Sequence, residues 1–193
     1  MSESDTSIVR YRLDASQSKF TAQAFATGLL AGFGHNPTIG IRDFVGEAQY
    51  TSGSLTEAAL RLVVNVKSLT VLDDVKEKDR HEIERTMLND VLEASLTPEI
   101  VFQSTSITTT RIAEGRYKAR IIGDLTLHGV TRNGLWIMAQ VTLDGDQLRA
   151  QGDFTIKQTD YKIKLVSVAA GALKLKDELK FSFDLVGHRE NVP

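Results

Sequence analysis

His81 and Glu82 are the residues whose order comes nearest to a catalytic motif. The pair begins like the zinc-binding sequence His-Glu-x-x-His, in which two imidazoles one helical turn apart hold the metal. The fifth position is Arg85, so the second histidine is missing. The chain contains no cysteine, which removes thiolate ligands and a thiol nucleophile. We therefore expect neither a metal site nor a cofactor.

The other histidines each have a non-catalytic interpretation. His35 lies in a glycine-rich stretch, where it either lines the mouth of a cavity or hydrogen-bonds its own loop. His128 precedes a glycine and suits a turn, and His188 suits a solvated tail. No Gly-x-Ser-x-Gly motif and no triad spacing is present. We expect no catalytic residue and no enzyme, although a hydrolase or isomerase that uses His35 or His81 stays open as an alternative.

The elements that would position such residues are strands. Residues 116–156 hold three runs in which apolar and polar side chains alternate, so each run gives one face to a core. Asn133-Gly134 and Asp144-Gly145 separate the runs and tolerate the positive φ of tight hairpin turns. The sequence therefore predicts an antiparallel meander here.

The inward face of this meander contains unusually small residues among the large ones. They are Ala119, Gly123, Ala139, Ala150 and Gly152. In a barrel, small inward residues leave space for a small ligand. They also relieve crowding where a sheet bends. Both explanations stay open on the sequence alone.

The rest of the chain predicts more strands and one main helix. A turn at residues 14–17 is expected to separate the first two strands, and an Asp74/Glu77 capping box is expected to begin the helix. An apolar stripe follows on that helix: Ile83, Met87, Leu88, Val91 and Leu92. The strands are expected at Ile8–Leu13, Lys19–Ala26, Thr38–Thr51, Ala58–Val66, Glu99–Thr105 with a possible extension over Ile107–Thr110, and Glu178–Val186. This pattern predicts an all-β fold with one main helix, either a barrel or a sandwich.

Length and charge limit the classes of partner. The 193 residues predict one domain over residues 8–188, with a flexible tail at 1–7 and another at 189–193. A net charge of -2 gives no reason to expect nucleic acid as a partner. No window reaches the ~18 apolar residues that a membrane span needs. The polar, acidic start lacks the features of a signal peptide, so we expect a cytoplasmic protein, or a periplasmic one if a leader was removed.

Several segments, taken in order, resemble a known family. They read YRLDASQSKFTAQA, GHNPTIGIRDFVGEA, VVNVKSL, DRHEIE, LTPEIVFQS, GDLTLHGVTR and GDFTIKQTDY. Together they are similar to the YceI-like family of bacterial lipid-binding proteins over residues 8–188. The resemblance implies an extended, lipocalin-like antiparallel β-barrel with an apolar tunnel, non-catalytic lipid binding, and a possible homodimer. The chain departs from the family's pattern at Thr86-Met87-Leu88 and at Thr159–Lys162, so no role is carried over to those positions.

Pattern and resemblance together favour one function, the binding or carriage of a long apolar lipid of isoprenoid, quinone or fatty-acyl type. Moving an apolar chain from water into a lined tunnel gains ~25 cal/mol per Å² buried. The alternatives are the cavity-histidine enzyme and a solid-barrel interaction module. The predicted ligand-binding residues are Phe20, Ala22, Ala24, Phe33, His35, Leu60, Leu62, Val64, Phe102, Ile121, Leu125, Leu135, Ile137, Phe154, Phe181 and Phe183.

Overall fold

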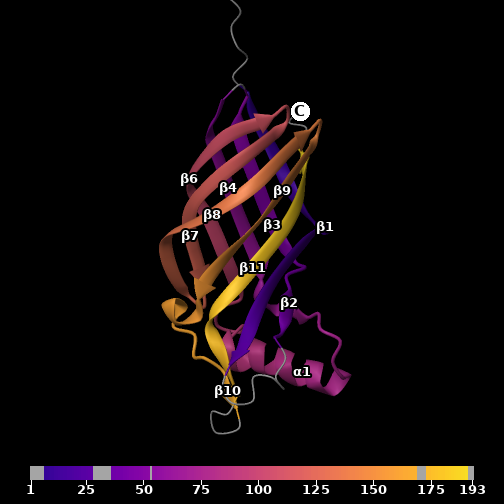
Figure 1. The fold of residues 1–193 in the computed structure, drawn as a ribbon, viewed down its shortest axis with the longest axis vertical. Coiled ribbons are helices and arrows are strands. Elements are labelled where there is room, and N and C mark those ends of the chain that lie inside the picture. Colours follow the sequence, from indigo (N-terminus) through magenta and orange to yellow (C-terminus); the bar gives the residue numbers. More distant parts are fainter. Residues whose placement is uncertain (1–6, 28–35, 53, 169–172, 191–193) are drawn as a thin grey trace, which may run out of the picture.

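The protein is an elongated β-barrel with one helix at its lower end, as a computed structural model shows (Figure 1). The structure describes residues 7–27, 36–52, 54–168 and 173–190. Its strands are β1 (Ile8–Thr27), β2 (Thr38–Gly40), β3 (Phe44–Thr51), β4 (Ser54–Asn65), β5 (Thr70–Val71), β6 (Glu99–Ala113), β7 (Arg116–Leu127), β8 (Val130–Asp144), β9 (Gln147–Lys157), β10 (Ser167–Val168) and β11 (Leu173–Arg189). The helical elements are η1 (Val66–Ser68), α1 (Glu77–Thr86), η2 (Met87–Val91) and η3 (Gln158–Tyr161).

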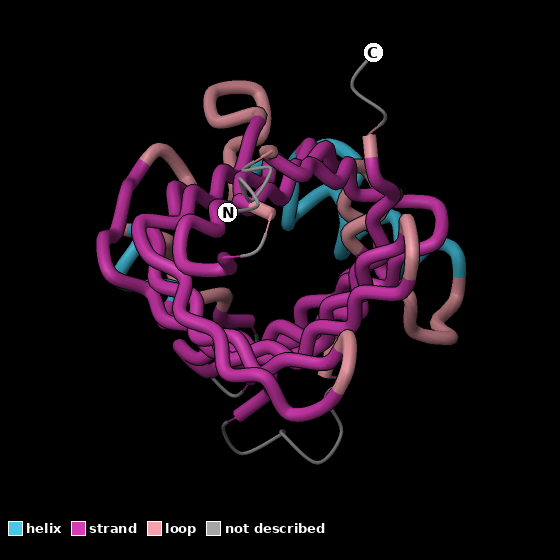
Figure 2. Tube along the Cα trace, turned by 90° about the horizontal axis from the view of Figure 1, so that it is seen from above, coloured by secondary structure: helices cyan, strands magenta, loops and turns pink. Residues whose placement is uncertain are grey.

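Eight of the strands form the barrel wall, in the order β11-β9-β8-β7-β6-β4-β3-β1. β1 pairs antiparallel with β11 from Tyr11↔Arg189 to Thr27↔Lys174, and this pairing closes the ring seen in Figure 2. The closure confirms the barrel and rules out the sandwich. We call the end that carries α1 the helix end. The opposite end, where the β3–β4, β6–β7 and β8–β9 connections lie, is the hairpin end.

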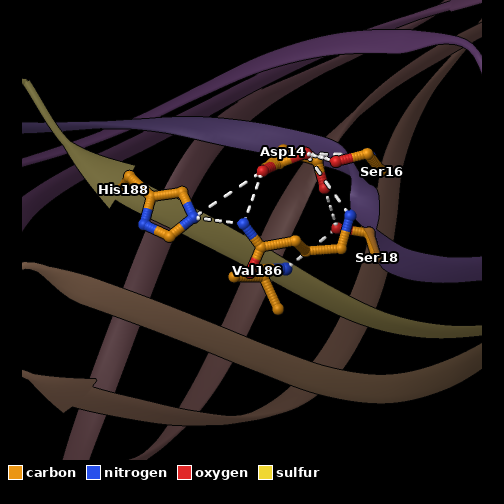
Figure 3. A network of polar contacts seen from close by, with 6 residues as sticks. Asp14, Ser16, Ser18, Val186 and His188 are labelled. Atoms are coloured by element: carbon orange, nitrogen blue, oxygen red, sulfur yellow. Dashed lines mark hydrogen bonds and ion pairs between the residues drawn. The ribbon is translucent and has the colours of Figure 1, made fainter.

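The turn predicted at residues 14–17 is wrong, because β1 continues through it. The Asp14 carboxylate accepts hydrogen bonds from the Ser16 amide at 2.8 Å and the Gln17 side chain at 2.8 Å (Figure 3). The Ser18 hydroxyl accepts one from the Val186 amide at 3.0 Å. The hydrogen bonds from Ser16, with that of its hydroxyl foremost, and those from Gln17 lower the pKa of Asp14. They stabilise a register shift between Asp14 and Lys19 while β11 keeps the strand direction unchanged.

The first turn of the meander also differs from the prediction. The β7–β8 hairpin turns at His128 (φ 51°) and Gly129 (φ 68°), in agreement with a turn role for His128. Asn133-Gly134 lies inside β8 at a register shift, where the Gly134 amide donates to Asp124 Oδ1 at 3.3 Å. Gly145 (φ 57°) does lie in the β8–β9 turn, as predicted. Residues that favour turns thus also occur at β-bulges. Pairing with the neighbouring strand decides whether such a residue forms a turn or a bulge.

The predicted helix forms, but its capping box does not. Lys76 is the N-cap residue of α1, and no side chain caps the helix. The helix runs through Thr86 into η2, a single π-type turn. Its apolar stripe packs against the core through Met87, Leu88, Val91 and Leu92. Among the described residues, no helix combines the length and the apolar composition needed to cross a bilayer.

Side chains tie the helix end of the barrel together. His128 Nε2 lies 2.8 Å from Glu93 Oε2, and His128 Nδ1 lies 3.2 Å from the carbonyl oxygen of Tyr161. These contacts join the segment after η2, the β7–β8 turn and η3. Glu93 (φ 45°), His128 (φ 51°) and Lys162 (φ 58°) all have left-handed backbone conformations, which side chains disfavour. Three strained positions in one neighbourhood indicate that tertiary contacts fix this end firmly.

An ion pair on the outer wall makes the unfolding free energy depend on pH. Arg149 Nε and Nη2 donate to the two carboxylate oxygens of Asp184 at 2.7 and 2.6 Å. The hydrogen bonds from Arg149, aided by Gln151, hold the pKa of Asp184 below its ordinary value of 3.8. Because the folded-state pKa is lowered, the contribution is present above the unfolded-state pKa and is lost as pH falls through the folded-state pKa.

We therefore expect Asp184→Asn to lower the unfolding free energy by about 1 kcal/mol at neutral pH. The loss of stability on acidification below about pH 4 should be shallower than in the wild type, although Asp14 and Asp177, whose pKa values are also lowered, preserve part of it. Urea unfolding at a series of pH values measures both effects. Parallel pH curves for the two proteins would contradict the assignment.

Candidate ligand-binding cavity

A cavity of about 170 Å³ lies inside the barrel. It extends from Leu55 and Leu143 near the hairpin end to Val64 and Leu127 near the helix end, and all eight wall strands contribute to its lining. A single water needs only ~10–15 Å³. The space is therefore large enough for part of a sizeable molecule.

The cavity wall is almost entirely apolar. Among the described residues that line it, none is charged, and the polar ones are Gln49, Tyr50, Thr109 and Tyr117, all in the half near the hairpin end. Water gains little from entering a space without hydrogen-bonding partners, and such cavities stay dry or take apolar molecules. The arrangement suits an uncharged, hydrophobic occupant.

Most of the predicted wall residues come together here. Phe20, Leu60, Leu62, Val64, Phe102, Ile121, Leu125, Ile137, Phe154, Phe181 and Phe183 all line the cavity. Ala24 is buried away from it, and Ala22 and Leu135 pack against the core without lining it. Phe33 and His35 lie outside the described residues. Contact of any of these side chains with a ligand stays a prediction.

Four phenylalanines form a cluster on one side of the wall. The rings of Phe154 and Phe181 stack with centroids 4.8 Å apart. Phe20 and Phe183 meet edge to face, with centroids 6.5 Å apart. They come from β1, β9 and β11, which are adjacent in the sheet. Along each of these strands every second side chain points into the barrel, so residues far apart in the sequence share one surface.

The space above the inward glycines is filled, so the idea that they leave room for a ligand is wrong. A Cβ on Gly152 would lie 2.7 Å from Phe183 Cζ, and one on Gly123 would lie 2.5 Å from Phe102 Cζ. Neighbouring aromatic rings cover these glycines, a known way of packing against the missing side chain. Ala119 and Ala150 do line the cavity. The small residues therefore serve two purposes, ring packing at the glycines and free volume at Ala119 and Ala150, whereas Ala139 is buried without lining the cavity.

Near the hairpin end the cavity has lining residues that the prediction missed. They are chiefly Ala48, Tyr50, Leu55, Ala58, Ala59, Ile107, Thr109, Tyr117, Val141, Leu143 and Leu148. The alternation in β7 and β8 already placed Tyr117, Val141 and Leu143 on the inner face. Next to them Tyr11 is buried and its ring stacks on that of Tyr50 at 6.2 Å. Burial, followed by a hydrogen bond with Tyr50, raises the pKa of Tyr11 to about 12, so Tyr11 is uncharged at physiological pH.

None of the histidines that the structure describes lines the cavity. His81 is exposed on α1, His128 is held in its turn, and His188 contacts the β1 irregularity. Within the described ranges, no group of three histidine, aspartate or glutamate side chains is placed to hold a metal ion. The described lining of the cavity thus contains no histidine, carboxylate, lysine or arginine side chain that would favour the enzyme alternative.

The sequence and the fold both match known proteins. The model of the YceI-like domain matches residues 11–187. The UPF0312 protein of Pseudomonas fluorescens is 33% identical over 92 residues, a match that covers 47% of this chain and 43% of that relative. The chain therefore matches less than half of that relative's length.

Solved structures show the same architecture. BcnA of Burkholderia cenocepacia superposes with a TM-score of 0.68 at 16% identity, covering 90% of this chain and 98% of that one. A polyisoprenoid-binding domain from Saccharophagus degradans gives 0.65 at 16% identity, covering 93% and 98%. At this level of identity the likeness establishes the shared fold.

Proposed function

Because the chain belongs to the family of proteins with a YceI-like domain, we propose that it binds one long apolar lipid inside its barrel and performs no chemistry on it. The observation that carries the proposal is the cavity of about 170 Å³, whose lining, as far as the structure describes it, contains no charged side chain. Burial of ~300 Å² of hydrocarbon there would gain about 7 kcal/mol before the costs of association. The hydrophobic effect alone is thus sufficient for useful affinity.

The isoprenoid class is the form of this proposal that we favour. The similar domain from Saccharophagus degradans is described as polyisoprenoid-binding, and its fold covers nearly the whole of this chain. Branched, flexible chains suit a wall that mixes flat phenylalanine rings with alanines. The apolar lining also argues for a ligand whose buried part is neutral, because a charge inside would lack a partner.

We expect the recombinant protein to capture a lipid from its host, because an empty apolar cavity is a favourable site for any hydrocarbon. Native mass spectrometry should show an added mass that disappears on denaturation, and organic extraction should identify a single long chain. Delipidated protein should then bind all-trans-retinol, a fluorescent isoprenoid alcohol, with one site per chain. Protein that is repeatedly lipid-free and does not take up retinol would contradict lipid binding.

A further inference from the structure

The barrel wall has a seam between β4 and β6. The two strands pair from Asn65↔Glu99 to Arg61↔Gln103, and within the described residues their pairing goes no further. We call the unpaired stretch, Ser54–Leu60 facing Ser104–Ala113, the seam. The other pairs of neighbouring wall strands have a paired end near the hairpin end, for example Ala113↔Arg116 between β6 and β7. Between β3 and β4, residues 55–58 of β4 also lack a ladder partner among the described residues, but the pairs Gln49↔Ala59 and Thr51↔Ser54 close this gap on both sides. The seam is therefore a local opening in a wall that is otherwise closed at this end.

A β-bulge in β6 accounts for the seam. The β6–β7 register shifts between Ser104 and Ser106, which leaves Thr105 as the extra residue. A bulge bends its strand and can end pairing with a neighbour. The Leu60 amide, which would otherwise continue the ladder, donates to the Ser104 hydroxyl oxygen at 2.8 Å instead. The ladder thus ends at a defined point, and β6 follows β7 beyond it.

The cavity lies directly behind the seam. Leu55, Ala58 and Ala59 of β4 and Ile107 and Thr109 of β6 line it, and these residues lie on both sides of the unpaired stretch. Leu60 points into the barrel, so its neighbour Ala59 would normally point outward. Ala59 nevertheless contacts the cavity, because it lies at the unpaired edge of its strand. From Ser104 to Thr110 the β6 side of the seam carries no charge and no proline. On the β4 side, Ser54–Leu60 contains one charged residue, Glu57, whose carboxylate accepts a hydrogen bond from the Thr51 hydroxyl of β3 at 2.7 Å. A hydrocarbon passing here would therefore meet mostly uncharged side chains.

The two ends of the barrel offer less suitable routes. At the helix end, η2, the β7–β8 turn and η3 are joined through His128. At the hairpin end, the buried ring of Tyr11 stacks on Tyr50. Passage between any other two wall strands near the hairpin end would have to separate at least one pair of residues of a backbone ladder. Separation of β4 and β6 along the seam separates no such pair and costs only the side-chain hydrogen bonds at Leu60.

We propose that the lipid enters and leaves the cavity sideways, through the seam between β4 and β6. This inference rests on the proposed function, because it concerns the route of the ligand that the cavity binds. The seam sets the rates of uptake and release of the ligand. A barrier on the route changes both rates alike, so the dissociation constant does not depend on it.

A cross-link across the seam tests the route. The chain lacks cysteine, so Glu57→Cys/Thr108→Cys supplies a unique pair on the two edges of the seam, at exposed positions that do not line the cavity. A short bismaleimide joins the pair, and intact mass confirms the bridge. The same variant capped with N-ethylmaleimide is the unbridged reference. Arg61→Cys/Gln103→Cys is the matched control, because these exposed residues already face each other in the ladder.

Uptake of all-trans-retinol is followed by stopped-flow fluorescence, and release by transfer to phosphatidylcholine vesicles. We expect the seam bridge to slow both rates by about tenfold or more while the dissociation constant stays within about twofold. The control bridge should leave both rates unchanged. Unchanged rates in the bridged seam variant, or equal slowing by both bridges, would overturn the lateral route. Capped variants that bind no retinol at all would instead overturn the proposed function.

Discussion

Replacement of Ala150 by leucine is expected to weaken retinol binding strongly while the protein stays folded. Ala150 lines the cavity from β9, where it pairs with Leu185 of β11. A leucine side chain at this position would extend into the empty space that the ligand needs. Filling existing space avoids the ~1–3 kcal/mol that overpacking a dense core costs. We therefore expect binding to weaken by more than about tenfold, with an unfolding free energy within about 1 kcal/mol of the wild type.

Fluorescence titration and urea unfolding measure these two quantities separately. Gln140→Leu is the matched control, because it adds leucine to the exposed outer face of β8, opposite Gln151 on the same wall. The control should bind retinol normally. An Ala150→Leu protein that is strongly destabilised and still binds retinol would show that this position belongs to a solid core.

Gly152→Ala, two residues along the same strand, is expected to have the opposite effect. A Cβ at Gly152 would collide with the backbone oxygen of Met138 and would lie 2.7 Å from Phe183 Cζ. A backbone atom of the neighbouring strand cannot move aside without distorting the ladder. We expect the unfolding free energy to fall by about 2–3 kcal/mol.

Urea unfolding of Gly152→Ala beside Asp153→Ala makes the comparison direct. Asp153 is the next residue, and its side chain is exposed on the outer face. Its replacement should change stability by less than about 0.5 kcal/mol. A Gly152→Ala protein as stable as this control would mean that the wall at Gly152 yields easily, contrary to the close packing described.

Strand alternation was sufficient to predict the faces of the barrel wall. In β11, Phe181 and Phe183 line the cavity while Lys180 is exposed, as the period of two requires. The same rule placed Ile121 and Leu125 inside. Side-chain direction depends only on position within a strand, so a regular run fixes it without knowledge of the partner strands.

Features that depend on a neighbouring strand were not predictable in this way. Asp14 and Gly134 are typical turn residues, but each lies in a strand that a partner keeps straight. The sequence shows Gly152 as small but does not reveal that the Phe183 ring covers it. The β6 bulge did leave a trace, because the inward residues change from even numbers at Ile100 and Phe102 to odd numbers at Ile107 and Thr109.

The pairing of β1 with β11 has a consequence for how the chain folds. Arg12 Nε donates to Glu190 Oε1 at 2.7 Å across a separation of 178 residues, so the ring closes between the first and last strands. Folds that depend on contacts between residues so far apart in the sequence form slowly, typically in milliseconds to seconds. During synthesis at ~5–20 residues per second, closure has to wait until β11 leaves the ribosome. For much of that time the apolar inner face of a half-built barrel is exposed, so the nascent chain is expected to depend on chaperones until its last strand arrives.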